Sequence, residues 1–344
     1  MCNIAGYIGE KRAAPILIEM LRRQQIYDGG YSTGIVTFHE GKLHMRKIIG
    51  DVDTLIRETD ALDLPGTIGL AHSRPGADHP AHAHPHLSNS GNLALVTNGT
   101  GYLYNERLTP PARMLEEKGY TFVTRKAPIE AVYHPQLSDG SPIFCLEMFV
   151  NLVEEYMKEG MTFDNAFLRA NDEHVGERVC VMLNACDPSA IRVTRQSRPM
   201  EVLLGKGESY IATTRFAFPE DVEGSVMSLP VLHVSKVYAG RVEILGEKMQ
   251  NLNTPEITPL TYRLVYDRVV KMLEEGEPCW DDIELAIRRM TDIWNHECPV
   301  TQYAKVGYDV LWQLKCEGRL ESRLDFGEHP KYGKRTLAYM SLKK

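Results

Sequence analysis

Short apolar runs separated by glycine, asparagine and charged residues fill much of the first 250 residues, a pattern typical of β-strands. Glu40-Gly41 lies between two of these runs and predicts a hairpin turn. The expected strands cover residues 2–8, 32–40, 42–50, 66–73, 92–98, 178–185, 190–196, 201–207, 209–214, 225–237 and 241–246.

Helical periodicity interrupts the strands at several places. Residues 13–25 form one amphipathic segment, and residues 106–120 form another whose prolines fit the start of a helix. Residues 145–159 and 162–171 predict two further helices. Strands, then helices, then strands again predict an α+β layered domain over residues 1–247.

The pattern changes after residue 247. Residues 248–260 are polar and contain two prolines, as a linker does. Three helix-like segments follow at 262–276, 280–294 and 305–320, and residues 322–342 predict two strands. Three helices and a hairpin are the outline of a winged helix, so we expect a winged-helix-like domain over 261–344.

The end of the chain is basic, with eight Lys or Arg against four acids between Lys315 and Lys344. A basic winged helix can contact DNA phosphates. However, the segment 306–320 is apolar over much of its length and mixed in charge. We therefore expect packing or dimerisation, with Trp294, Trp312 and Leu311 in the core, and a homo-oligomer. DNA binding is the less favoured alternative.

Composition narrows the class of protein. The net charge of −7 gives no general reason to expect nucleic acid or an anionic membrane as a partner. The seven cysteines are odd in number and lack CxxC spacing, which fits a reducing compartment rather than a disulfide framework or a zinc site. No apolar run approaches the roughly 20 residues of a membrane span. We expect a cytoplasmic protein without a cofactor or a metal.

Three positions suggest acyl-transfer chemistry. Cys2 follows the initiator methionine, whose removal would place a free amine beside the thiol. Asn98-Gly99 ends an apolar strand, where an amide side chain and a backbone N–H can stabilise an oxyanion. Arg74 ends another strand and can hold a carboxylate. The plainer alternatives are an edge-strand cysteine, an Asn-Gly turn and a surface arginine.

Six motifs occur in one order and carry a resemblance to a known family. They are MCNIAGYIG, AAPILIEMLRR, YDGGYSTGI, GLAHSRPG with AHPH, VTNG and SYIATTRFAF. In this order they resemble the class II glutamine amidotransferase domain, most closely the glutaminase half of glutamine–fructose-6-phosphate aminotransferase. The resemblance implies the four-layer αββα N-terminal-nucleophile hydrolase fold for residues 1–247. The isomerase domains of that aminotransferase have no counterpart here.

The resemblance also implies roles for individual residues. Cys2 becomes the nucleophile, with Asn98 and Gly99 as the oxyanion hole and Arg74 as the ligand of the substrate α-carboxylate. The substrate-binding set further includes Ser73, Asp78, His84 and His86. Because the AHPH stretch matches a family loop beside the pocket, His79, His82, His84 and His86 are better explained by loop ordering than by a metal site.

The chain also departs from the family pattern. Asn3 replaces a glycine beside the nucleophile, and Tyr27-Asp28-Gly29-Gly30 replaces the arginine before Gly-Tyr-Asp. The family loop that binds the α-ammonium of glutamine reads TRKAPI here (124–129), without an acid in register. Either Glu130 or Asp78 supplies that charge, or the substrate is an amide whose α-nitrogen is acylated or absent.

Two hypotheses follow. The first is an amidohydrolase that attacks glutamine or a related amide through a Cys2 thioester and releases ammonia to water or to a partner protein. The second is a ligand sensor that has lost catalysis, in which the altered pocket signals through the winged helix. Retention of Met1 would count against the first, because Cys2 would then have no free amine.

Overall fold

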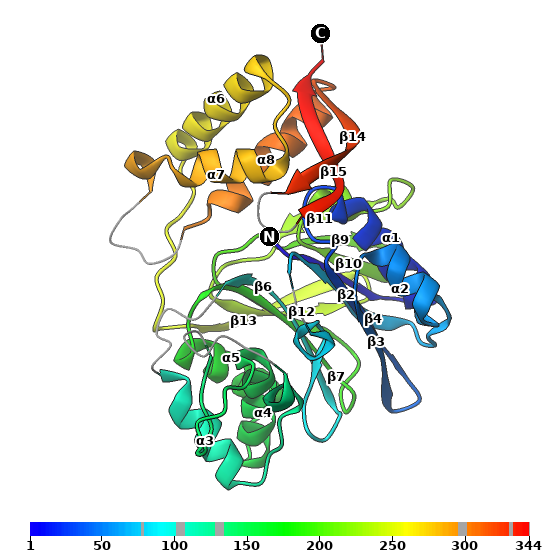
Figure 1. Cartoon of the computed structure of the whole chain (residues 1–344), viewed down its shortest axis with the longest axis vertical. Helices are drawn as coiled ribbons and strands as arrows, with labels where there is room; N and C mark the ends of the chain where they lie inside the picture. The colour runs from blue at the N-terminus through cyan, green and yellow to red at the C-terminus, as the bar shows by residue number, and fades with distance from the viewer. Residues whose placement is uncertain (77–78, 101–106, 128–133, 295–300, 330–332, 344) are drawn as a thin grey trace.

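Two antiparallel sheets form the body of the molecule (Figure 1). The computed structural model describes residues 1–76, 79–100, 107–127, 134–294, 301–329 and 333–343. The seven-stranded sheet has the order β11-β9-β10-β1-β4-β2-β3, and the six-stranded sheet has the order β13-β12-β8-β7-β6-β5. The strands are β1 Asn3–Ile8, β2 Ser32–His39, β3 Lys42–Ile49, β4 Ile68–Arg74, β5 His86–Leu87, β6 Leu93–Thr100, β7 Glu177–Asn184, β8 Ile191–Arg195, β9 Glu201–Gly205, β10 Glu208–Ala212, β11 Gly224–Ser228, β12 His233–Tyr238 and β13 Arg241–Lys248.

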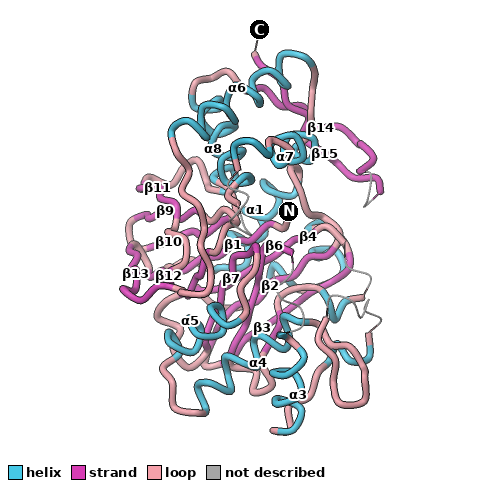
Figure 2. The backbone as a smooth tube through the Cα atoms, turned by 90° about the vertical axis from the view of Figure 1, so that its left-hand side faces the viewer, coloured by secondary structure: helices cyan, strands magenta, loops and turns pink. Residues whose placement is uncertain are grey.

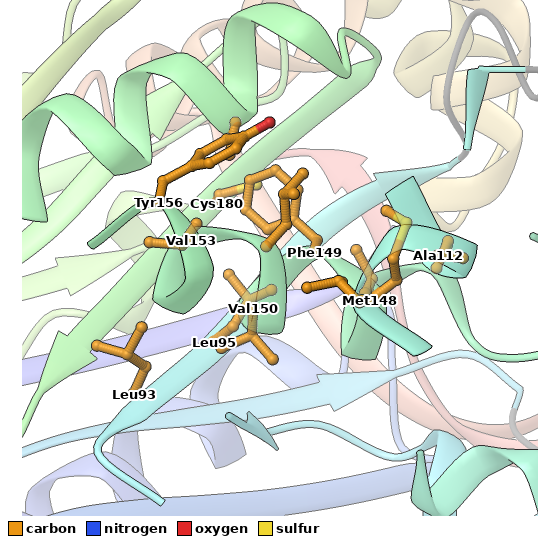
Figure 3. Close-up of a cluster of buried hydrophobic side chains, with 14 of the residues drawn as sticks. Leu93, Leu95, Ala112, Met148, Phe149, Val150, Val153, Tyr156 and Cys180 are labelled. Carbon is orange, nitrogen blue, oxygen red and sulfur yellow. The ribbon is translucent and has the colours of Figure 1, made fainter. Parts of the chain in front are cut away.

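Helices cover the outer face of each sheet, which makes four layers. On the seven-stranded sheet lie α1 (Ala13–Gln25) and α2 (Val52–Glu58), and their apolar residues share one core with β1 and β4. On the six-stranded sheet lie α3 (Thr109–Glu117), α4 (Cys145–Lys158) and α5 (Phe163–Glu173). Figure 3 shows this second core, in which Phe149 and Val150 of α4 face Leu95 of β6.

A third core lies between the two sheets. It is built from β-branched and aliphatic residues such as Ile4 of β1, Val96 of β6 and Val181 of β7, all fully buried. Burial of such side chains is the main favourable contribution to folding. The αββα layering expected from the sequence is therefore confirmed.

The chain after residue 258 contains three helices and a hairpin (Figure 2). They are α6 Pro259–Glu275, α7 Trp280–Arg288, α8 Tyr303–Cys316, β14 Leu320–His329 and β15 Gly333–Leu342. Trp280 of α7 stacks on Tyr308 of α8 with ring centroids 3.7 Å apart. These are the elements expected from the sequence, while the winged-helix arrangement and the domain boundaries stay predictions.

Helix α8, the segment considered for DNA recognition, has most of its length buried. Leu311 is fully buried, as expected, whereas Trp294 and Trp312 are partly buried at the rim of the same core. Lys305 of α8 pairs with Glu201 of β9 at 3.3 Å, so α8 also contacts the layered body. Most side chains of α8 lie inside the protein, which favours the packing role over DNA recognition, although both stay predictions.

Three details differ from the sequence expectation. The strand expected over 225–237 is two strands, β11 and β12, which belong to different sheets and are separated at Pro230. Proline lacks the N–H that a central ladder requires. Helix α2 was not expected, and α7 ends at Arg288, before Trp294. In the described part of the chain, no helix is both long and apolar enough to cross a membrane.

Candidate active site

Cys2 and Asn98 lie together although 96 residues separate them in the sequence. Cys2 precedes β1 of one sheet, and Asn98 belongs to β6 of the other. The Cys2 backbone nitrogen donates to Asn98 Oδ1 at 3.0 Å, and Thr213 Oγ1 donates to the Cys2 carbonyl at 3.3 Å. Two of the three expected catalytic residues are thus in direct contact.

The Asn98 side chain uses only one end of its amide. Because the Cys2 N–H can only donate, Oδ1 must face it, and Nδ2 is left on the other side. Nδ2 is buried and has no hydrogen-bond partner among the described residues. A buried donor left unpaired costs about 1–3 kcal/mol. An oxyanion forming beside Cys2 would pair with it.

Gly99 has a conformation that a side chain would not permit. Its φ is +131°, and a Cβ built there would lie 1.9 Å from the carbonyl oxygen of Glu177 on the neighbouring strand β7. A residue with a Cβ would have to move β6 away from β7. Glycine here therefore fixes the backbone next to Asn98.

The loop after α1 packs against the start of β1. Asn3 Nδ2 donates to the Asp28 carbonyl at 2.5 Å, and Gly30 N donates to Ser73 Oγ at 2.9 Å. Gly29 has φ +91°, and a Cβ there would lie 2.9 Å from Asn3 Nδ2. Asn3 and Ser73, expected to flank the nucleophile and to bind substrate, both hold this loop in place.

Three carboxylates surround the amino terminus, and we call them the acidic pocket: Asp28, Asp281 and Glu284. One oxygen of each lies within 4.8 Å of the others. The Met1 amine pairs with Asp28 Oδ2 and lies 4.0 Å from Glu284 Oε2. Figures 1 and 2 show the amino terminus between the sheets and the C-terminal helices.

Arginine 335 of β15 borders the acidic pocket. Its Nη2 lies 3.1 Å from Asp281 Oδ2, its Nη1 lies 3.5 Å from Asp28 Oδ1, and Nη1 also donates to the Gly29 carbonyl. The hairpin β14–β15 therefore reaches the loop that follows α1.

Arg74 lies at the end of β4, one residue beyond Ser73, the register partner of Asn3. This register brings Arg74 to the end of the sheet where Cys2 lies. Its Nη1 donates to the His82 carbonyl at 3.2 Å, and its guanidinium lies 5.8 Å from the Phe144 ring centroid. Nε is buried without a hydrogen-bond partner in the described chain.

The expected histidine loop packs around Phe144. The rings of His82, His86 and His134 lie 5.4, 5.0 and 5.1 Å from the Phe144 centroid. His84 stacks on His72 at 4.0 Å. Within the described ranges, the only carboxylates, thiols and imidazoles that converge on one cation position are those of the acidic pocket.

Histidine side chains also fix β6 one residue before Asn98. The Thr97 N–H donates to His84 Nδ1 at 3.2 Å, and His72 Nε2 lies 2.8 Å from the Thr97 carbonyl. Burial lowers the pKa of His72 to about 3, and it also holds the pKa of His84 well below 6.5. His84 is therefore neutral and can accept this hydrogen bond. This contact holds Thr97, the residue before Asn98, and the substrate-binding role of His84 stays a prediction.

Some expected residues cannot be placed. Asp78 and Glu130, the two candidates for the missing ammonium partner, lie outside the described residues. The loop at 124–129, which lacks an acid in register, is held at its start by Glu147. The Glu147 carboxylate accepts hydrogen bonds from Val123 N at 2.6 Å and Thr124 N at 3.0 Å.

Sequence reasoning missed the acidic pocket. Asp28 was noted only as a departure from the family pattern, and Glu284, Asp281 and Arg335 lie beyond the region of resemblance. The only signal for this pocket in the sequence was that Tyr27-Asp28-Gly29-Gly30 stands where the family has an arginine. No local pattern indicated that α7 and β15 would fold back onto the amino terminus.

Known proteins with a similar sequence match about three quarters of this chain. A scan against models of protein families matched none. Glutamine–fructose-6-phosphate aminotransferase from Pyrococcus horikoshii is 30% identical over 255 residues, 71% of this chain and 39% of that protein. The enzyme of the same name from Bacteroides thetaiotaomicron is 31% identical over 271 residues, 77% of this chain and 40% of that protein. The chain thus spans about two fifths of the length of these curated relatives.

Solved structures with the same fold cover a similar part of the chain. Glutamine phosphoribosylpyrophosphate amidotransferase from B. subtilis, complexed with ADP and GMP, superposes with a TM-score of 0.54 at 19% identity. It covers 72% of this chain and 49% of its own. A structure described as the allosteric regulatory enzyme of purine biosynthesis gives 0.55 at 18% identity.

Proposed function

This chain carries a class II glutamine amidotransferase domain, and from that premise we propose that it is an N-terminal-cysteine amidohydrolase acting on the side-chain amide of glutamine or a related compound. The observation that carries the proposal is the contact between Cys2 and Asn98, with Asn98 Nδ2 left as a buried donor. Residues 1–247 would perform the chemistry, and residues 261–344, a winged-helix-like domain, would cover the amino terminus.

The reaction requires that Met1 be removed. The free Cys2 amine then takes the thiol proton, and the thiolate attacks the amide carbon. Asn98 Nδ2 and the Gly99 N–H stabilise the tetrahedral oxyanion. The C–N bond breaks as the leaving nitrogen receives the proton, which releases ammonia and leaves a thioester on Cys2. Water hydrolyses the thioester to the acid and restores the thiol.

Arg74 would bind the substrate carboxylate in this scheme. Its position at the end of β4, level with Cys2, supports that role. Ammonia passes to water or to a partner protein.

The test is ammonia release from glutamine, asparagine and N-acylated amides, after mass spectrometry has shown whether Met1 is absent. We expect release by the wild-type chain and none by Cys2→Ala. Equal release by Cys2→Ala would refute Cys2 as the nucleophile. Binding of an amide without release would instead favour the sensor hypothesis.

A further inference from the structure

The acidic pocket is a cation site that the amino terminus itself occupies. Asp28 is buried, with its side chain 1% exposed, and its Oδ2 faces the amino terminus. Its pairing partner there is the Met1 amine. Glu284 Oε2 faces the same amine, while Oε1 lies 3.4 Å from Arg198.

Removal of Met1 would leave this pocket with an excess of negative charge. Cys2 N is already held by Asn98 Oδ1, so it stays at the oxyanion side rather than moving toward Asp28. Arg335 contacts Asp28 Oδ1 and Asp281, whereas the Met1 amine pairs with Asp28 Oδ2. A buried carboxylate without a cation is strongly unfavourable, so the vacated pocket selects a positive group.

The cation that fits is a primary ammonium. The Met1 amine is itself an ammonium, and it lies within about 3.6 Å of the Cys2 nitrogen, because a single residue spans no more than that. A substrate ammonium at this point would leave its side-chain amide within reach of Cys2. A divalent metal ion is disfavoured because the Arg335 guanidinium contacts two of the three carboxylates.

We propose that the acidic pocket, with Asp28 from the loop after α1 and Glu284 from α7, binds the α-ammonium of the amide substrate. This inference rests on the proposed function and adds which part of the substrate the protein recognises. It accounts for the loop at 124–129, which lacks an acid, because the carboxylate comes from a different part of the chain. Helix α7 thereby becomes part of the substrate site.

The experiment compares three amides that differ only at the α-nitrogen: glutamine, N-acetylglutamine and 4-carbamoylbutanoate. The proteins are produced with Cys2 as the first residue, checked by mass. We expect Glu284→Gln and Asp28→Asn to raise the KM for glutamine at least about tenfold, since a buried charge loses its partner. The two amides without an ammonium should be unaffected by either substitution.

Glu275→Gln is the matched control, because this carboxylate ends α6 and is 64% exposed. It should behave as the wild type. Thermal unfolding of each variant shows that it is folded, and if one variant does not fold, the other decides. Equal effects on all three amides, or none on glutamine, would overturn the ammonium site. A requirement for Mg²⁺ or Ca²⁺ that EDTA abolishes would also overturn it.

Failure of the proposed function gives a separate result. If the wild-type chain releases ammonia from none of the amides, the catalytic proposal is refuted, and calorimetric binding tests the pocket alone. Preferential binding of glutamine over N-acetylglutamine that Glu284→Gln removes would support the ammonium site. Absence of that preference would refute it.

Discussion

The two ends of the Asn98 amide do different work, and substitution can separate them. Asn98→Asp keeps an acceptor for the Cys2 N–H but removes the donor. We expect kcat to fall by about 10²–10³ with little change in KM, the size of effect seen when one oxyanion donor is removed. Steady-state ammonia release measures it. An unchanged kcat would show that Asn98 only positions Cys2.

Glycine at position 99 is required by space as well as by conformation. Gly99→Ala puts a Cβ against the Glu177 carbonyl, whereas Gly91→Ala meets no atom within 4 Å at a similarly positive φ of +76°. Both variants carry the cost of a left-handed conformation, about 1 kcal/mol. Only Gly99→Ala should lose substantially more stability in urea unfolding, together with activity. Equal losses would contradict the close approach of β6 and β7.

The sequence predicted the position of a site residue best where that residue lies at the end of a strand. Cys2, Asn98 and Gly99 come from recognisable strand ends, and the first two are in contact as expected. Ser73 and His84, predicted to bind the substrate, make hydrogen bonds to Gly30 and Thr97, and their substrate role stays a prediction. Their side chains face the protein interior, and the residue type alone does not give that direction.

At the scale of elements, the buried histidines that pack beside β6 and Phe144 should make the fold sensitive to acid. Burial lowers the pKa of His72 to about 3 and that of His134 to about 4, against about 6.5 in an unfolded chain. Below pH 6.5 the unfolded chain binds protons that the folded chain does not. Stability is therefore complete above pH 6.5 and falls as the pH decreases.

Each such histidine contributes up to about 1.4 kcal/mol per pH unit in this range. Urea unfolding between pH 7.5 and 5 measures the slope. His134→Gln removes one titrating ring. The dependence of the unfolding free energy on pH should therefore become shallower by up to the contribution of one bound proton. An identical slope in the variant would mean that this ring is protonated in the folded state as readily as in the unfolded one.

The ends of helices and strands show which boundaries a local sequence pattern can predict. The hairpin at Glu40-Gly41 is confirmed, since both residues have positive φ. The signal for α2 was present, because Asp51 accepts from Thr54 N as an N-cap, but it was overlooked. Helix α7 ends at Arg288, and the Ile287 carbonyl then accepts hydrogen bonds from Met290 N and Trp294 Nε1.

At the scale of the whole molecule, the four layers follow from the sequence, whereas the docking of the C-terminal part does not. Alternating strands and amphipathic helices bury one face each, so their number and order restrict the architecture. The contacts that join α7, α8 and β15 to the body include apolar ones, such as Phe216 against Trp312 of α8, and pairs of charged residues far apart in the chain. Arg335 reaches the Gly29 carbonyl across 306 residues, for example. No periodicity encodes such a pair.

Arg198 makes several of these connections at once. Its guanidinium lies 2.7 Å from the Tyr303 hydroxyl, 2.9 Å from Glu177 and 3.4 Å from Glu284. Burial lowers its pKa, but Tyr303, Glu177 and Glu284 together outweigh this and hold the pKa above its usual value. The residue therefore stays charged and bridges β7, α7 and α8.

Arg198→Met would leave two carboxylates without their cation. We expect a loss of about 3–5 kcal/mol in the free energy of unfolding, as for other broken buried pairs. The exposed Arg57→Met should change it by no more than about 0.5 kcal/mol. Limited proteolysis between residues 249 and 258 should also become faster in Arg198→Met, because α7 and α8 would separate from the sheets more often. If both variants unfold and are cut alike, the C-terminal helices are held by their apolar contacts alone, and the position of Glu284 near the amino terminus does not depend on this bridge.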